Sequence, residues 1–288
     1  MSPTLKTVFV TLAPQTLRPD EACFGPEDTP FRAVTDLVLM LWNSLDFATS
    51  LLRDRDQVFR RFQITLHTLT TESEVSTLLT ALASPQRTHS LQVITIGHHP
   101  SIASGAGLSA GDRHGIFVRY PLSYETLRPL SSLVHLRTLA INLSHPVSLN
   151  DQEFAKLVCN WPLLEVLQMT WIRGERSSVS ITLEGLLSLL ASCPKLREIS
   201  LTLDARDVPA QGMYTDVCNP LITSPIHFYN SPLKDPELIA DFLLKHLPSM
   251  PRVRWTHASH VHPTTDVNSN LEYQRLWTQV NQRLRPVA

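Results

Sequence analysis

Histidines supply the densest group of potential metal ligands in this sequence. His257, His260 and His262 lie close together, and His98 and His99 are adjacent. Imidazoles at such spacing can bind zinc or copper. The first group, however, lies in a polar stretch that contains a proline and no nearby cysteine. We therefore expect solvent-exposed histidines there, and we predict neither a metal site nor a cofactor.

Sequence patterns typical of enzymes are weak or missing. Gly105, Gly107 and Gly111 are spaced somewhat like a phosphate-binding loop, but the Lys-Ser/Thr ending is missing and no helix pattern follows at once. Neither G-x-S-x-G nor H-E-x-x-H occurs. We predict a flexible glycine-rich loop and no catalytic residues. An enzyme of unknown class is the alternative, which a deep pocket holding two titratable groups within hydrogen-bond reach would favour.

The cysteines suggest structural roles. The sequence contains Cys23, Cys159, Cys193 and Cys218, with no C-x-x-C pair, so we expect reduced thiols in an intracellular protein, cytoplasmic or nuclear. Cys159 and Cys193 each lie just before a proline-containing step, and no partner base is visible for either thiol. We predict that both are buried small hydrophobes, because free cysteine usually packs that way. We place Trp161, which follows Cys159, in the core or at a helix end.

Composition excludes several classes of partner. The chain has 288 residues, a formal net charge of −1 and 43% hydrophobic residues, as in ordinary globular proteins. Because the charge is balanced, we expect no binding to nucleic acid or to an anionic membrane. No apolar run is long enough to cross a bilayer, and the N-terminus lacks the features of a secretory signal. We expect a monomer.

A repeated phrase, L-x-x-L-x-L, organises the chain. It occurs at residues 91–96, 136–141, 164–169 and 196–201. A phrase that recurs every few dozen residues indicates stacked units, because each unit has an apolar edge that it cannot bury alone. The central apolar residues of the predicted strands are Leu37, Phe62, Ile94, Leu139, Leu167, Ile199, Ile226 and Val253. Their intervals lie mostly near the roughly 20–29 residues of leucine-rich repeats.

These intervals predict an α/β leucine-rich-repeat solenoid, in which a curved parallel sheet carries helices on its convex face. Thr71, Asn150, Thr182 and Asp235 are predicted to start helices, because each can accept a hydrogen bond from a free backbone N–H group. A further helix is predicted at about 122–131. We divide the chain into an irregular segment (1–30) with a possible edge strand at 7–12, the repeat array (31–256) with a glycine-rich insertion (97–121), and a polar linker with a C-terminal helix (257–288).

The order of these phrases resembles a known family. The stretches 159–167, 182–186 and 193–199, followed by Asn219-Pro220 and by 231–236, are similar to the fungal F-box-like leucine-rich-repeat family. The resemblance is best over 122–256 and extends to about 31. The sequence departs from regular leucine-rich repeats, since Ser144, Ile172 and Asp204 stand where an asparagine is common. Residues 1–31 do not match an F-box.

The resemblance implies a non-catalytic protein-interaction scaffold that recruits an unidentified target protein for ubiquitination. Binding to the adaptor of a cullin-RING ubiquitin ligase is expected only if an F-box is supplied. The alternative is a truncated or degenerate repeat protein without a ubiquitin-ligase role. On the concave face, we expect the residues between the buried ones to contact the target: Thr138, Ala140, Asn142, Val166, Gln168, Thr170, Glu198, Ser200 and Thr202.

Overall fold

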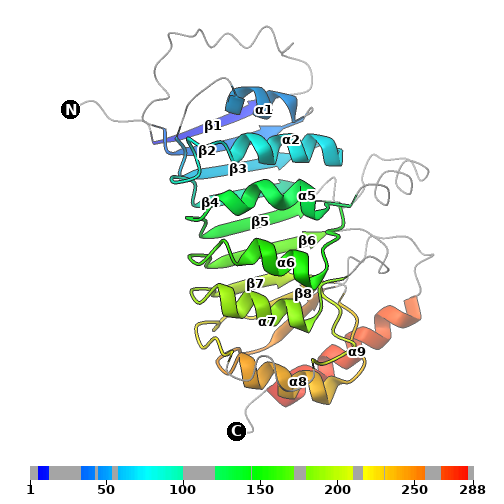
Figure 1. Ribbon diagram of the computed structural model, residues 1–288. Coiled ribbons are helices and arrows are strands. Elements are labelled where there is room, and N and C mark those ends of the chain that lie inside the picture. Colours follow the sequence, from blue (N-terminus) through cyan, green and yellow to red (C-terminus); the bar gives the residue numbers. More distant parts are fainter. Residues whose placement is uncertain are drawn as a thin grey trace, which may run out of the picture.

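The structure is a computed structural model that describes residues 6–12, 34–42, 45–53, 58–99, 121–143, 145–171, 180–209, 217–229, 231–256 and 267–284. In this part of the chain, nine parallel strands form one open sheet, in which spatial order follows sequence order (Figure 1). The strands are β1 (Thr7–Leu12), β2 (Asp36–Leu41), β3 (Arg61–Leu66), β4 (Val93–His98), β5 (Thr138–Leu143), β6 (Val166–Trp171), β7 (Glu198–Leu201), β8 (Ile226–Tyr229) and β9 (Val253–Thr256).

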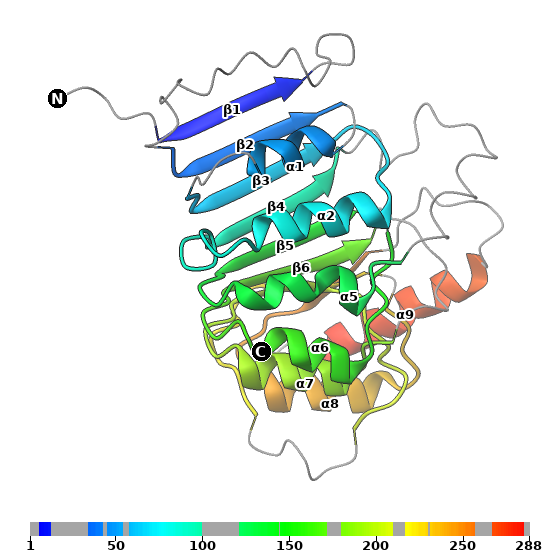
Figure 2. The same cartoon turned by 45° about the horizontal axis from the view of Figure 1, so that its top comes forward.

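The helices between the strands cover one face of the sheet (Figure 2). They are α1 (Asp46–Arg53), α2 (Glu72–Leu82), α5 (Tyr124–Leu127) with the 3₁₀ helix η3 (Arg128–Ser132), α6 (Asp151–Val158), α7 (Leu183–Ser192) and α8 (Pro236–His246). The curved sheet with helices on its convex face confirms the predicted leucine-rich-repeat architecture. None of the described helices is both long and apolar enough to cross a membrane.

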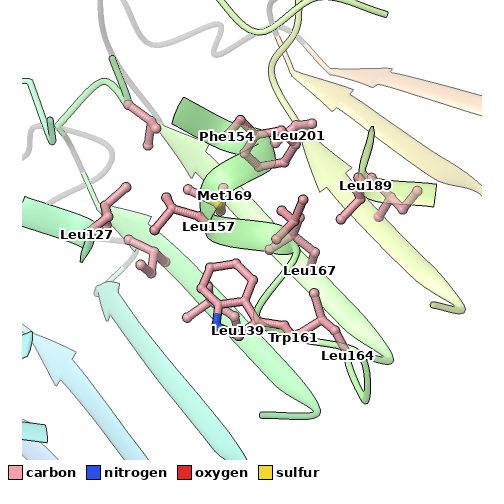
Figure 3. Close-up of a cluster of buried hydrophobic side chains, with 14 of the residues drawn as sticks. Leu127, Leu139, Phe154, Leu157, Trp161, Leu164, Leu167, Met169, Leu189 and Leu201 are labelled. Carbon is pink, nitrogen blue, oxygen red and sulfur yellow. The ribbon is translucent and has the colours of Figure 1, made fainter. Parts of the chain in front are cut away.

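The repeated phrase sets the register of the strands. Leu139 pairs with Leu167, and Leu167 pairs with Ile199, on the adjacent strands β5, β6 and β7. All three side chains are fully buried under the helices. In Figure 3, Phe154 and Leu157 of α6 lie over Leu167 and its neighbours. Each unit therefore closes its apolar layer only against the next unit, as the repeat predicts.

Polar caps fix where the helices begin. The Thr71 hydroxyl accepts a hydrogen bond from the Glu74 N–H at 3.2 Å, and the Glu74 carboxylate accepts one from the Thr71 N–H at 2.7 Å. Asn150 and Glu153 repeat this capping box at the start of α6. Such reciprocal bonds satisfy N–H groups that a helix leaves free. The helix starts that the sequence predicts are thus found at their predicted residues.

Asp151, the first residue of α6, also holds the start of α7. Its carboxylate accepts hydrogen bonds from the backbone N–H and the hydroxyl of Thr182, both at 2.7 Å. Gly185 lies against this link: a Cβ added there would lie 2.5 Å from the Asp151 carboxylate and 2.8 Å from Ile181. The glycine therefore allows two neighbouring repeats to approach closely.

Some elements differ from the sequence prediction. The structure contains α1, which the sequence analysis did not identify, and the helix expected at about 122–131 is a short α-helix followed by a 3₁₀ helix with Pro129 near its start. Proline cannot donate a backbone hydrogen bond, which favours this break. The glycine-rich insertion was expected to start at residue 97, but Gly97 and His98 belong to β4. Residues 100–120 of the expected insertion lie outside the described part.

The C-terminal helix α9 (Val267–Leu284) closes one end of the sheet. Its Trp277 packs against Phe228 of β8, with the ring centroids 5.3 Å apart, and donates a hydrogen bond from Nε1 to the Ser231 carbonyl. Its Asn281 accepts a hydrogen bond from the Val253 N–H and donates one to the Val253 carbonyl, both at 2.7 Å. The side chain of Asn281 thus takes the place of a neighbouring strand at β9.

Candidate protein-interaction surface

The predicted binding residues form rows across the concave face. The register aligns Thr138, Val166 and Glu198 in one row and Ala140, Gln168 and Ser200 in the next. A third row pairs Asn142 with Thr170, and Thr202 lies beyond the end of β7. All nine alternate along the chain with buried residues of the helix side, because successive side chains of a strand point to opposite faces of the sheet. Whether they bind a partner stays a prediction.

A chain of hydrogen bonds joins the polar members of these rows. The Thr170 hydroxyl donates to Asn142, whose amide donates to Gln168 at 3.5 Å. The Gln168 amide in turn donates to the Glu198 carboxylate at 2.7 Å. The chain crosses β5, β6 and β7. These hydrogen bonds hold the side chains in position, and a surface that is already ordered loses less entropy on binding.

Not all of the predicted surface is accessible. Ala140, Thr170, Ser200 and Thr202 are buried, whereas the sequence analysis treated them as available to a partner. Ala140 and Ser200 are short and flank the longer Gln168 in the register, so their neighbours limit access to them. Partial exposure is retained by five residues of the set, which we call the concave binding surface: Thr138, Asn142, Val166, Gln168 and Glu198.

The concave face continues beyond the predicted set onto β8 and β9. His227 pairs in register with Ser200 and with Arg254, and its ring stacks on Tyr229 at a centroid distance of 6.1 Å. Burial lowers the pKa of His227, Arg254 lowers it further, and Glu198 acts in the opposite direction. Sequence reasoning did not single out these residues, although the alternation of His227 and Tyr229 with the apolar Ile226 and Phe228 was a signal for this face.

Aromatic rings stack where β2, β3 and β4 end. Trp42 lies 3.6 Å from His67, and His67 lies 4.1 Å from His99, measured between ring centroids. Burial, followed by the charge of His99, lowers the pKa of His67. The rings are neighbours because the parallel register places the residues after these strands side by side. They extend the concave face with a row of stacked aromatic rings.

The histidine pair at 98 and 99 is divided between the two faces. His98 is buried on the helix side, and burial together with the charge of His145 lowers its pKa to about 4. His145 lies 3.3 Å from the Thr70 hydroxyl. Within the described ranges, no three histidine, cysteine, aspartate or glutamate side chains form a group that could hold a metal ion. His257, His260 and His262 lie outside those ranges, as do Gly105, Gly107 and Gly111.

The prediction for the cysteines was half wrong. Cys193 is buried and burial raises the pKa of its thiol to about 12, but Cys159 is exposed at the end of α6. The strand register shows why: Leu164 and Leu196 begin equivalent phrases, so Trp161, not Cys159, occupies the position of Cys193. Trp161 is buried and donates a hydrogen bond from Nε1 to the Leu130 carbonyl at 3.0 Å, which confirms its predicted place in the core.

The described part also contains a partly buried carboxylate between two helices. Burial acts to raise the pKa of Glu72, but hydrogen bonds from Thr126 and Ser123 and the charge of His145 hold it below its usual value. An ionised carboxylate held by two hydroxyl donors at the start of α2 ties α2 to α5. Glu72 thus has a structural role, because a carboxylate stabilises the start of a helix and this one also joins two helices.

The chain was compared with family models, curated proteins and solved structures. No family model matches this chain. No curated protein matches it either. Among solved structures, it is similar to a chain in the crystal structure of the Rad7 and Elc1 complex in yeast, with a TM-score of 0.29, 9% sequence identity, and coverage of 82% of this chain and 73% of that chain. A likeness this distant carries no argument about activity or partners.

Proposed function

We propose that this protein is a non-catalytic interaction scaffold whose concave binding surface holds a segment of a target protein. The observation that carries the proposal is the hydrogen-bonded chain from Thr170 through Asn142 and Gln168 to Glu198. It lies on the face opposite the interstrand helices and consists of groups that can exchange hydrogen bonds with a peptide. Repeat arrays commonly bind along such extended concave surfaces.

The resemblance to fungal F-box-like proteins extends this proposal. On that basis the bound target would be presented for ubiquitination inside the cell, in the cytoplasm or the nucleus. The adaptor of a cullin-RING ligase would join only through an F-box, and residues 1–31 do not match one. The alternative proposal is a repeat protein that binds its target without any ubiquitin-ligase role.

A pair of matched double variants tests the scaffold proposal. Thr138→Arg with Gln168→Arg places two cations on partly exposed positions of the concave binding surface. Thr80→Arg with Gln152→Arg makes the same two changes on exposed positions of α2 and α6, on the opposite side of the sheet. The wild-type chain is first used to isolate a target, which is identified and purified. Its affinity for the wild type and both variants is then measured by calorimetry.

We expect the concave variant to bind the purified target at least about tenfold more weakly, a loss of about 1.4 kcal/mol, and the helix-side variant to bind as the wild type does. The helix-side variant should melt near the wild-type temperature, because exposed substitutions usually change stability by less than about 0.5 kcal/mol. The concave variant should melt slightly lower, because Gln168 loses its hydrogen bonds with Asn142 and Glu198. Equal affinity for all three proteins would show that the target does not use the concave binding surface. Catalytic turnover of the target by the wild-type chain would contradict the non-catalytic part of the proposal.

A further inference from the structure

The two ends of the parallel strands carry opposite charges, although the whole chain is nearly neutral. Where the strands end and the helices begin, the charged residues are mainly acidic. They include Asp46, Glu72, Glu74, Glu125, Asp151, Glu153, Glu184 and Glu237, all in first turns of helices. Negative charge stabilises the start of a helix, so the fold itself accounts for these acids.

At the amino ends of the strands, the charge is mainly positive. Lys6, Arg60, Arg137 and Arg197 stand directly before β1, β3, β5 and β7. The carbonyl groups of Lys6, Arg60 and Arg137 each accept hydrogen bonds from the next strand in the same pattern, so the four residues occupy one register position. We call these four residues the amino lip. Every one of them is exposed.

Further cations flank the amino lip. Arg61 starts β3, while Arg252 and Arg254 lie at the start of β9, and all three are exposed. The described acids at this end of the strands are Asp36, Glu165 and Glu198.

Ion pairs within the described part of the chain account for at most one of the four cations of the amino lip. In the described part of the chain, the one ion pair made by a member of the amino lip joins Arg137 to Glu165 at 2.6 Å. Arg60 donates a hydrogen bond from Nε to the neutral Gln92 at 3.0 Å. Exposed arginines that neither cap a helix nor pair with an acid add little to folding stability. Their alignment in one register position is therefore unexplained by the fold.

The spacing of the amino lip suits one kind of ligand. Neighbouring strands lie about 4.8 Å apart, so cations on alternate strands recur every ~9.6 Å, and the row from β1 to β7 spans about 29 Å. A polyproline II segment has three residues per turn and a rise of about 3.1 Å, so every third side chain returns to one face after ~9.3 Å. Carboxylates at every third position would thus meet successive cations.

We propose that the amino lip binds an acidic polypeptide segment that crosses the strands, with carboxylates at about every third residue opposite Lys6, Arg60, Arg137 and Arg197. This proposal rests on the proposed scaffold function and names the chemistry of the target. Thr138 and Glu198 of the concave binding surface directly follow Arg137 and Arg197 in the chain, so the same target can reach both. A guanidinium group also binds a carboxylate through two hydrogen bonds, which favours arginine in this role.

The same row does not suit nucleic acid. A nucleic-acid backbone carries a charge about every 3.4 Å along each strand, so phosphates would necessarily face Glu165, which lies between Arg137 and Arg197 in the register. A polypeptide can place a neutral residue there. The positions between the cations on β2, β4 and β6 are Thr35, Gln92 and Glu165, none of which is an aromatic ring on which a base could stack.

Synthetic probes test this proposal without a cellular target. The probe is a fluorescein-labelled peptide of four Glu-Pro-Pro repeats, and the control peptide has four Gln-Pro-Pro repeats. A third probe is single-stranded DNA of similar length. Binding to the full chain is measured by fluorescence anisotropy at two salt concentrations. The test variant is Arg60→Gln with Arg197→Gln, and the matched control is Lys234→Gln with Arg275→Gln, which removes two exposed cations elsewhere.

We expect the glutamate peptide to bind the wild type and the matched control equally and the test variant three- to tenfold more weakly. Its affinity should fall with salt, and less steeply for the test variant because two charge contacts are missing. The glutamine peptide should not bind. Equal affinity of the test variant and the wild type for the glutamate peptide would overturn the proposal, as would DNA binding more tightly than the peptide and weakening in the same variant.

The two proposals fail in different ways. If Thr138→Arg with Gln168→Arg leaves target affinity unchanged while the test variant loses the glutamate peptide, the scaffold surface is wrong and the amino lip stands. If the target binds through the concave binding surface while the glutamate peptide binds no form of the chain, the acidic chemistry is wrong and the scaffold stands.

Discussion

Replacement of Gly185 by alanine tests the close approach between two repeats. In a helix, alanine is usually more favourable than glycine by about 1 kcal/mol, so propensity alone predicts a more stable protein. The structure predicts the opposite. The added Cβ would lie 2.5 Å from a carboxylate oxygen of Asp151 and 2.8 Å from Cγ2 of Ile181. Crowding of this kind in a packed region costs about 1–3 kcal/mol.

The carboxylate cannot move away freely, because it accepts two 2.7 Å hydrogen bonds from Thr182. Weakening these bonds adds a cost of about 1–2 kcal/mol, since each joins a charged acceptor to a backbone or hydroxyl donor. After the gain in helix propensity is subtracted, we expect Gly185→Ala to lower the free energy of unfolding by about 2 kcal/mol. Urea unfolding followed by circular dichroism should show a lower midpoint with an unchanged slope.

Two further variants make this test specific. Gly97→Ala in β4 is the matched control, because its added Cβ would meet the Asn142 carbonyl at an ordinary 3.6 Å. It should leave the midpoint nearly unchanged. Asp151→Ala should reduce the additional cost of Gly185→Ala, which a double-mutant cycle measures as a coupling energy. A Gly185→Ala protein as stable as the wild type, or more stable, would refute the argument that this glycine is required by the approach of Asp151.

Two other predictions concern the core and the response to acid. Leu167→Ala should lower the free energy of unfolding by about 2–5 kcal/mol, because apolar burial is lost and a cavity remains. Val166→Ala on the concave face should lower it by less than about 1 kcal/mol. Similar urea midpoints for the two variants would contradict the register. His98 should destabilise the protein in acid: its pKa is about 4 when folded, against 6.5 for the ordinary side chain, so the unfolded chain binds the proton first as the pH falls. The contribution is complete above about pH 6.5 and reaches a loss of about 3 kcal/mol near pH 4, at about 1.4 kcal/mol per pKa unit. Urea titrations from pH 7.5 to pH 4 should therefore show a shallower pH dependence for His98→Gln than for the wild type, and equal slopes would count against the buried neutral histidine.

The sequence predicted the features of the fold that depend on local periodicity. Leu139, Leu167 and Ile199 occupy the same buried position in successive repeats. The repeated phrase that contains them therefore also predicts the register between strands. Capping residues such as Asn150 act within one turn of their own helix and can be recognised one at a time. The helix α1 was missed even though Leu45, Ala48 and Leu52 are buried at helical spacing, because it is short and carries no copy of the phrase.

Properties that depend on neighbouring repeats were not predictable from a single phrase. The alternation of a strand tells which face Ser200 occupies, but its access is limited by the length of Gln168 on the next strand. Cys159 was misplaced because the residues before each phrase were compared by type instead of by distance to the first leucine. The low pKa of His98 likewise depends on its burial and then on the charge of His145, which comes from another strand connection.

The hydrogen bonds between Asn281 and Val253 limit how copies of this chain can assemble. A fibre built by sheet extension needs β9 of one copy to add to β1 of the next, and such head-to-tail contacts repeat without end. Asn281 already occupies the N–H and carbonyl groups of Val253 on the outer side of β9. These two groups are therefore not available to β1 of another copy. Pairing of β1 with β1 of a second copy would form a symmetric contact, which closes on itself and stops at two copies. One asparagine thereby covers part of the edge of a long, open parallel sheet and opposes its polymerisation.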